Sequence, residues 1–113
     1  MRARTPNVGP VHMKTGDEQD VRRIISSLTK EEKAVLLAAN ESGDLHKFTS
    51  DNAGDWVGGR QDLTDPKNPA FAISHLEALA TLVAKRLIMQ ETKDHYHLTS
   101  LGFKVRAALS PTV

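Results

Sequence analysis

Residues 71–109 contain three successive patterns that together restrict the fold more than any other segment. In the first pattern, apolar residues recur at steps of three and four: Ile73, Leu76, Ala80, Val83 and Leu87. This period predicts a helix with one apolar side, which Leu79 widens. Two short runs around a charged turn follow, and then a second amphipathic segment. A helix, a hairpin and a helix in this order predict a small domain that is mainly α with a small β-sheet.

The first helix is expected to begin near Ala70, because Pro69 suits the first turn and Asn68 or Asp65 can cap free N–H groups. The side opposite the apolar stripe is small and polar, with Ser74, Ala78, Thr81 and Lys85 flanked by Glu77 and Arg86. It is free to enter a nucleic acid groove or to face water. Leu82 lies outside the stripe and is expected to be exposed.

A β-hairpin is predicted over residues 88–98. Alternation along its second strand places Tyr96 and Leu98 on one side and His95 and His97 on the other. A last helix is expected to follow. Thr99 or Ser100 can cap it, Pro111 ends it, and Gly102 is tolerated there at a modest cost. The apolar face of this helix consists of Leu101, Val105 and Leu109, broadened by Phe103.

The segments ISHLEALATLVAKRLI and YHLTSLGFKVRAAL resemble the winged-helix DNA-binding domains of MarR- and PadR-like transcriptional regulators. The first is similar to their recognition helix and the turn after it. The second is similar to their second wing strand and the Leu-Thr-x-x-Gly opening of the next helix. The resemblance implies a winged helix-turn-helix, with a recognition helix at about residues 70–86 and a wing at about residues 88–98.

This resemblance implies a DNA-binding transcriptional regulator whose recognition helix enters the major groove of double-stranded DNA while the wing rests on the backbone. The residues expected to contact DNA are Asn68, Ser74, His75, Thr81, Lys85 and Lys93. Each of them also fits a solvent-facing role, and Lys93 fits an ordinary turn. A homodimer is expected, because two-fold pairing matches palindromic half-sites. Its expected interface is formed by the outer helices, residues 17–28 and 101–109.

The charge distribution supports an alternative function. The formal net charge is +1, and Arg2 and Arg4 supply all of this excess. Residues 14–69 carry a net charge of −3 and residues 70–113 a net charge of +2. Such a polarised chain is less basic than most DNA-binding domains. The alternative is therefore a winged-helix protein–protein interaction module without DNA binding, in which Trp56 and Arg60 contact the partner.

The residues before the recognition helix predict three further elements. Val21, Ile24, Ile25 and Leu28 repeat at the spacing of a short amphipathic helix. Thr29 and Glu32 form a capping-box pattern for a second helix, which Gly43 is expected to stop. Residues 45–48 are predicted to form a strand that pairs with the wing.

The segment between this strand and the recognition helix departs from the family pattern. Residues 50–57, capped by Thr49 or Ser50, are predicted to form a brief helix that Gly54 weakens. Trp56 would pin this helix to the core if it does not contact a partner. Residues 58–68 are predicted to form a long loop.

Residues 1–13 are expected to be a disordered leader, because residues 1–12 contain two prolines and no helical or strand period. The pair His12-Met13 is typical of a cloning junction, so Met13 is expected to be the natural first residue. The intact mass of the natural protein tests this expectation. Residues 14–113 are then expected to form one winged-helix domain with an additional N-terminal helix.

Several classes of function lack their sequence signals. No apolar run approaches the roughly 20 residues of a membrane span, and no signal peptide is present, so a cytoplasmic protein without a membrane partner is expected. The absence of cysteine excludes disulfides and thiol chemistry. His95 and His97 supply only half of a metal site, so no metal or other cofactor is expected. No catalytic motif organises the Ser, His and Asp residues, and an enzyme is not expected.

Overall fold

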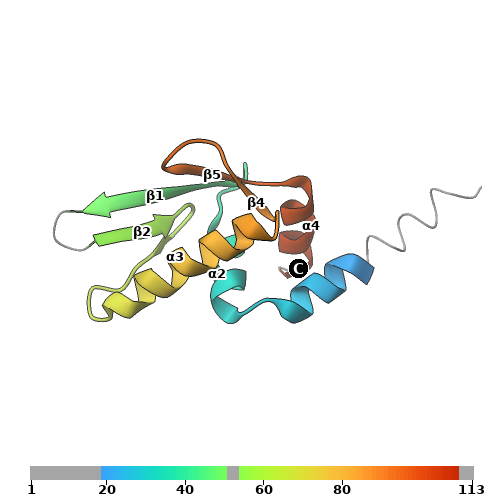
Figure 1. Cartoon of the computed structure of the whole chain (residues 1–113), viewed down its shortest axis with the longest axis horizontal. Coiled ribbons are helices and arrows are strands. Elements are labelled where there is room, and N and C mark those ends of the chain that lie inside the picture. Colours follow the sequence, from blue (N-terminus) through green and yellow to red (C-terminus); the bar gives the residue numbers. More distant parts are fainter. Residues whose placement is uncertain (1–18, 51–53, 110–113) are drawn as a thin grey trace, which may run out of the picture.

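The computed structural model describes residues 19–50 and 54–109. The expected leader, residues 1–13, lies outside these described residues. Figure 1 shows how the elements are arranged. Their order is a helix over residues 19–27, α2 (Lys30–Ala38), β1 (Asp44–Ser50), β2 (Gly54–Gly58), β3 (Asp62–Leu63), α3 (Pro69–Ala84), β4 (Ile88–Gln90), β5 (His95–Leu98) and α4 (Ser100–Leu109). The predicted α+β class is confirmed.

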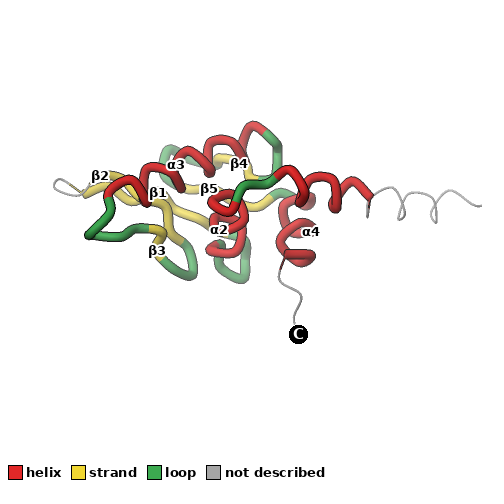
Figure 2. The backbone as a smooth tube through the Cα atoms, turned by 90° about the horizontal axis from the view of Figure 1, so that it is seen from below, coloured by secondary structure: helices red, strands yellow, loops and turns green. Residues whose placement is uncertain are grey.

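Five antiparallel strands form one sheet in the order β3-β2-β1-β5-β4. The central strand β1 contains residues 45–48, as predicted, and pairs with β5 over residues 44–46. The predicted pairing with the wing is therefore confirmed for Leu45 and His46. We use the name wing for the hairpin formed by β4 and β5. The helix α3 packs against β2, β3 and β4 and therefore spans the sheet (Figure 2).

The segment between β1 and α3 is a β-hairpin, so the brief helix predicted over residues 50–57 is wrong. Residues 54–58 form β2, in which Trp56 pairs with Phe48 of β1 and Val57 is fully buried. The predicted loop is also interrupted, since Asp62–Leu63 forms β3. A helix-turn-helix has a helix directly before its recognition helix, whereas in this chain β2 and β3 precede α3.

The side of α3 that faces the core differs from the predicted side. The buried residues are Ala72, His75, Ala78, Leu79 and Leu82. Ile73 is 55% exposed and Ala80 is exposed, although both belong to the predicted apolar stripe. Leu82, expected to be exposed, is completely buried. The two stripes have the same period and differ by about 100° of rotation, so spacing alone does not distinguish them.

The capping box of α2 is confirmed. The amide of Glu32 donates to Thr29 Oγ1 at 3.1 Å, and the amide of Thr29 donates to Glu32 Oε1 at 2.8 Å. The helix ends at Ala38, before the predicted stop at Gly43, which instead has φ 85° in the turn that leads to β1. Side chains from distant parts of the chain bind the carbonyls of Leu37 and Ala39 at this end of the helix.

The core lies between the sheet and α2, α3 and α4. Its fully buried side chains are Leu36, Leu45, Leu82, Leu87, Ile88, Leu98, Val35, Val57 and Val105. The helix over residues 19–27 adds Val21, and Leu28 follows it into the core, so this predicted helix packs on the domain. The predicted last helix is confirmed, with Thr99 Oγ1 accepting a hydrogen bond from Gly102 N at 3.0 Å. In the part of the chain that is described, every helix is too short or too polar to cross a membrane.

Candidate functional site

The six residues predicted to contact DNA differ widely in exposure. Asn68, Thr81, Lys85 and Lys93 are exposed, and Ser74 is half-buried. His75 is only 5% exposed, and its Nδ1 donates to the carbonyl of Phe71 at 2.6 Å. Its ring also lies 4.3 Å from the Phe71 ring, measured between centroids. The prediction that His75 contacts a groove is therefore corrected, because rotation of α3 places this side chain in the interior.

Lys85 caps the C-terminal end of α3 and pairs with a buried carboxylate. Its Nζ lies 3.0 Å from Glu32 Oε2, and the Glu32 side chain is 4% exposed. Burial acts to raise the pKa of Glu32, but hydrogen bonds from Thr29 and the charge of Lys85 outweigh it and lower the pKa. A buried carboxylate without its cation is strongly destabilising. Lys85 therefore links the end of α3 to α2, and its charge is largely compensated.

The outward surface of α3 is almost uncharged. We call this surface the α3 face; its exposed residues are Ala70, Ile73, Glu77, Ala80, Thr81 and Ala84. A groove of about 330 Å³ runs between α3 and the sheet, lined by Leu76, Leu79, Ala80, Val83, Lys47, Asp55, Gln90 and Tyr96. The α3 face carries the one charge of Glu77, and the groove beside it carries the opposite charges of Lys47 and Asp55. Such a surface differs from the basic surface that DNA phosphates attract.

The tip of the wing carries more negative than positive charge. Lys93 is exposed there, but Glu91 and Asp94 lie on either side of it in the same turn. The carbonyl of Lys93 accepts a hydrogen bond from Gln90 Nε2 at 3.3 Å, which orders the turn. With one lysine and two carboxylates, the wing has little attraction for a DNA backbone.

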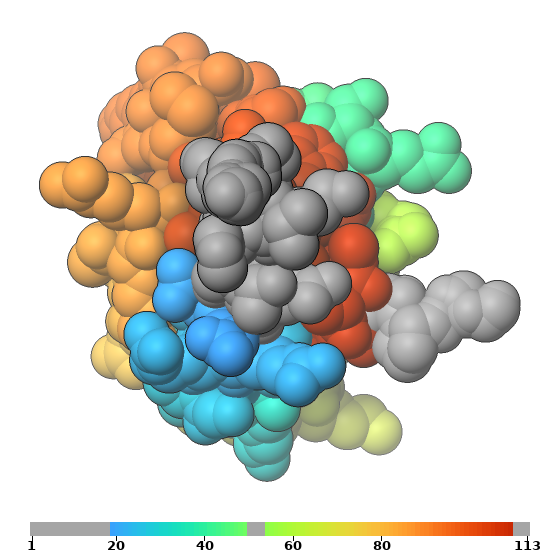
Figure 3. Space-filling model, turned by 90° about the vertical axis from the view of Figure 1, so that its right-hand side faces the viewer, coloured from blue at the N-terminus to red at the C-terminus, as the bar shows by residue number. Residues whose placement is uncertain are grey.

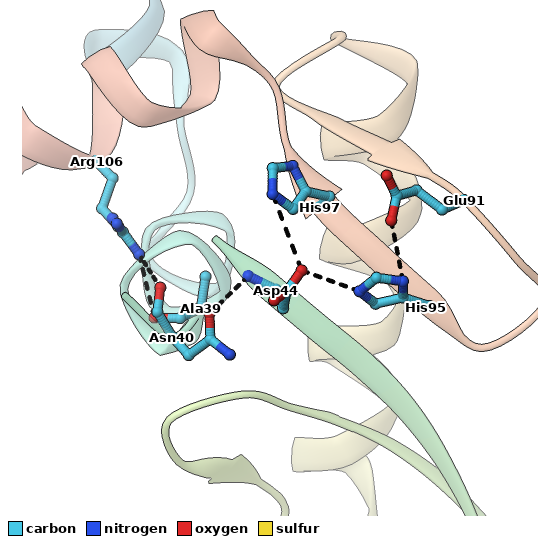
Figure 4. A network of polar contacts seen from close by, with 7 residues as sticks. All are labelled: Ala39, Asn40, Asp44, Glu91, His95, His97 and Arg106. Atoms are coloured by element: carbon cyan, nitrogen blue, oxygen red, sulfur yellow. Dashed lines mark hydrogen bonds and ion pairs between the residues drawn. The ribbon is translucent and has the colours of Figure 1, made fainter. Parts of the chain in front are cut away.

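A polar cluster joins the wing to β1 (Figure 4). His95 Nε2 lies 3.0 Å from Asp44 Oδ1, and His95 Nδ1 lies 3.0 Å from Glu91 Oε1. His97 Nε2 is 3.9 Å from the same oxygen of Asp44. The His46 ring stacks on the His95 ring with 4.8 Å between centroids. The predicted placement of His95 and His97 on one side of the strand is confirmed.

Both ring nitrogens of His95 therefore face carboxylate oxygens. The hydrogen bond from His95 lowers the pKa of Asp44, the charge of His97 adds to this effect, and burial opposes it. Neither nitrogen of His95 is free to act as a general base. Among residues 19–50 and 54–109, no cluster of three or more possible ligands is arranged to hold a metal.

The two predicted partner contacts have structural roles of their own. The ring of Trp56 is half-buried and stacks on Phe48 with 5.6 Å between centroids. Arg60 Nη2 donates to the carbonyl of Leu37 at 3.0 Å. Arg106 Nη1 donates to the carbonyls of Ala39 and Asn40 at 3.2 and 2.7 Å. The two arginines bind carbonyls at the end of α2, where cations are favourable and intrahelical partners are lacking.

No protein family model, curated protein or solved structure matches this chain.

Acid is expected to destabilise the fold through Asp44 and Glu32. Their pKa values lie below the ordinary values of 3.8 and 4.5, so each stabilises the fold above its unfolded pKa and loses this effect as pH falls through its folded pKa. Urea unfolding from about pH 7 down to about pH 3 should show falling stability below roughly pH 4.5. Asp44→Asn should shrink that fall; an unchanged pH profile would count against the His95 contact.

Proposed function

We propose that this chain is a winged-helix-like module that binds another protein through the α3 face. The observation that carries the proposal is the 55% exposure of Ile73 on a surface otherwise made of small residues and Glu77. Burying an apolar side chain of this size against a partner gains on the order of 1–2 kcal/mol. A helix with such a surface is better suited to another protein than to a nucleic acid.

The likeness to a winged helix is supported by the order of the elements. A helix, a strand, a spanning helix, a two-stranded wing and a closing helix follow one another, and β1 pairs with the second wing strand. The β2–β3 hairpin takes the place of the second helix. Since winged helices carry several unrelated functions, the role must be decided from the presented surface.

DNA binding by a transcriptional regulator is the second candidate. The observation in its favour is that Asn68, Thr81 and Lys93 are all exposed. Against it are the pairing of Lys85 with Glu32 and the two carboxylates beside Lys93. The charge available to contact phosphates is therefore small.

Mixed-sequence duplex DNA at two salt concentrations separates the two candidates. A protein-interaction module is expected to show no binding that falls steeply with salt, since few phosphate counterions would be released. Fluorescence anisotropy of labelled DNA measures this. Steep salt dependence that is weakened by Lys93→Ala and unaffected by Ile73→Asp would favour the regulator instead.

The interaction itself is tested with matched variants. Proteins captured by the wild type are identified by mass spectrometry, purified and titrated against Ile73→Asp and Lys93→Ala. Ile73→Asp should weaken the affinity by roughly tenfold or more, because it places a charge in an apolar contact, whereas Lys93→Ala should not. Circular dichroism confirms that both variants fold. A partner that distinguishes neither variant does not bind the α3 face.

A further inference from the structure

We infer that the groove between α3 and the sheet binds a free α-amino acid with an apolar side chain. The ammonium group of Lys47 and the hydroxyl of Tyr96 bind its carboxylate, and the carboxylate of Asp55 binds its ammonium group. This inference goes beyond the proposed protein contact and does not rest on it, because Ile73 lies outside the lining of the groove.

The strand register places these three polar groups on one face of the sheet. Lys47 pairs with Val57, so it lies diagonally opposite Asp55, which is two residues before Val57 on β2. On the other side, Tyr96 pairs with Leu45 and therefore lies diagonally opposite Lys47. Diagonal neighbours are about 7–8 Å apart, so one small ligand can contact all three groups.

Two opposite charges face the groove without meeting each other. Lys47 and Asp55 are half-buried, and both line the groove. In the part of the chain that the structure describes, neither side chain has an ion pair or a hydrogen bond. A ligand with a single charge would satisfy only one of the two groups. A zwitterion satisfies both, because it brings a carboxylate to Lys47 and an ammonium group to Asp55.

The hydroxyl of Tyr96 is independent evidence for a ligand. Tyr96 is only 7% exposed and lines the groove. Among residues 19–50 and 54–109, its hydroxyl has no hydrogen-bond partner. A buried tyrosine hydroxyl normally has one. The partner is therefore supplied by the occupant of the groove, and a carboxylate held by Lys47 is an acceptor within reach.

The opposite wall of the groove is apolar. It is formed by Leu76, Leu79, Ala80 and Val83 of α3. The groove volume of about 330 Å³ equals that of about eleven water molecules in the liquid, which is small for a ligand site. This space suits a single amino acid. An apolar side chain on this wall is removed from water, whereas glycine would leave the wall exposed.

Ligands related to L-leucine separate the contributions of its charges and its side chain. They are titrated into the isotope-labelled full-length chain, and dissociation constants are obtained from the amide shifts in NMR spectra. L-Leucine should bind with a Kd on the order of 1 mM or tighter. L-Leucinamide lacks the carboxylate and 4-methylpentanoate lacks the ammonium group, so each should bind about tenfold more weakly. L-Alanine should lose at least about tenfold, because it has little apolar surface.

Variants of the protein assign each charge to its contact. Lys47→Met should weaken L-leucine binding about tenfold but should not weaken L-leucinamide, which has no carboxylate to lose. Asp55→Asn should weaken L-leucine similarly but should not weaken 4-methylpentanoate. Tyr96→Phe removes only the hydroxyl and should weaken the two carboxylate ligands by about threefold. General distortion of the groove would weaken all the ligands alike.

Arg22→Met is the control for the loss of a positive charge. Arg22 is exposed on the helix over residues 19–27, which lies with α4 at the end of the molecule that faces the viewer in Figure 3. No residue of this helix lines the groove, so the affinity for L-leucine should not change. Ile73→Asp should likewise leave it unchanged. Circular dichroism confirms that each variant folds, and the ligand series on the wild type decides the matter if one does not.

Three results would overturn the inference. The first is that neither L-leucine nor L-phenylalanine binds saturably up to about 10 mM. The second is that N-acetyl-L-leucinamide, which lacks both charges, binds as tightly as L-leucine, which would make the groove a contact for a side chain of a protein partner. The third is that Arg22→Met weakens binding as much as Lys47→Met. The proposed function would survive the first and third results, because it fails only if no protein partner distinguishes Ile73→Asp from Lys93→Ala.

Discussion

Leu82→Ala is expected to lower the free energy of unfolding by about 2–5 kcal/mol, whereas Ile73→Ala should lower it by less than about 1 kcal/mol. Leu82 lies on the core side of α3 and is completely buried, so truncating its side chain leaves a cavity. Ile73 is 55% exposed and has little packing to lose. Urea unfolding of both variants at neutral pH, monitored by circular dichroism, measures the difference.

Comparison of these two variants shows which side of α3 faces the core. The sequence stripe predicts the reverse order, with Ile73 in the core and Leu82 outside it. Equal losses, or a larger loss for Ile73→Ala, would therefore contradict the burial of Leu82.

Locally encoded features were predicted well from the sequence. The capping box of Thr29 and Glu32 joins residues three positions apart, and the alternation of His95 and His97 follows from the strand itself. The cap of α4 is local as well, because Thr99 Oγ1 accepts a hydrogen bond from the amide of Gly102, three residues later. Each of these features is determined by neighbours in the chain, so a single sequence is sufficient to find them.

The orientation of α3 was missed for a different reason. The buried stripe includes Ala72, His75 and Ala78, which are not strongly apolar, while the exposed side carries Ile73. A pattern that ranks residues by hydrophobicity therefore selects the wrong side. The sequence did contain one sign of the correct side. The predicted stripe left Leu82, a large apolar residue, exposed to solvent.

The β2 strand was missed because its partner decides its conformation. The apolar residues around Trp56 and Val57 are too few to show either the helical or the strand spacing. Glycines on both sides of this segment weaken any helix. Pairing with β1 provides the hydrogen bonds, and the Phe48 ring stacks on Trp56. Strand formation depends strongly on such packing, which the local sequence does not contain.

The polar contacts of the candidate site are also nonlocal. Asp44 and His95 are 51 positions apart in the chain but only 3.0 Å apart in space. Lys85 reaches Glu32 only because α2 and α3 pack together. From the sequence, His95 and His97 were seen as only half of a metal site, with no metal expected, and Lys85 was expected to contact DNA. The fold instead gives each of them carboxylate partners, so their chemistry depends on positions that periodicity does not predict.

Gly102→Ala is expected to destabilise the fold by about 1–3 kcal/mol, the usual range for overpacking. In a solvated helix the same change is stabilising by roughly 1 kcal/mol, because alanine is the better helix former. Here an added Cβ would overlap the carbonyl oxygen of Leu87, which is backbone and cannot rotate away. That oxygen also accepts a hydrogen bond from Thr99 N at 3.1 Å. Urea unfolding gives the sign and size of the effect.

The sign of this effect tests how closely α4 approaches the end of α3. Ala108→Gly is the matched control, because Ala108 is exposed on the same helix and should lose only about 0.5–1 kcal/mol from propensity. If contact with Leu87 dominates, both variants lose stability although they change helix propensity in opposite directions. A stabilising Gly102→Ala would mean that α4 lies farther from Leu87 and that Gly102 has only the modest role expected from the sequence. Simultaneous losses would identify Gly102 as the residue that lets α4 pack beside Leu87, between the end of α3 and the start of the wing.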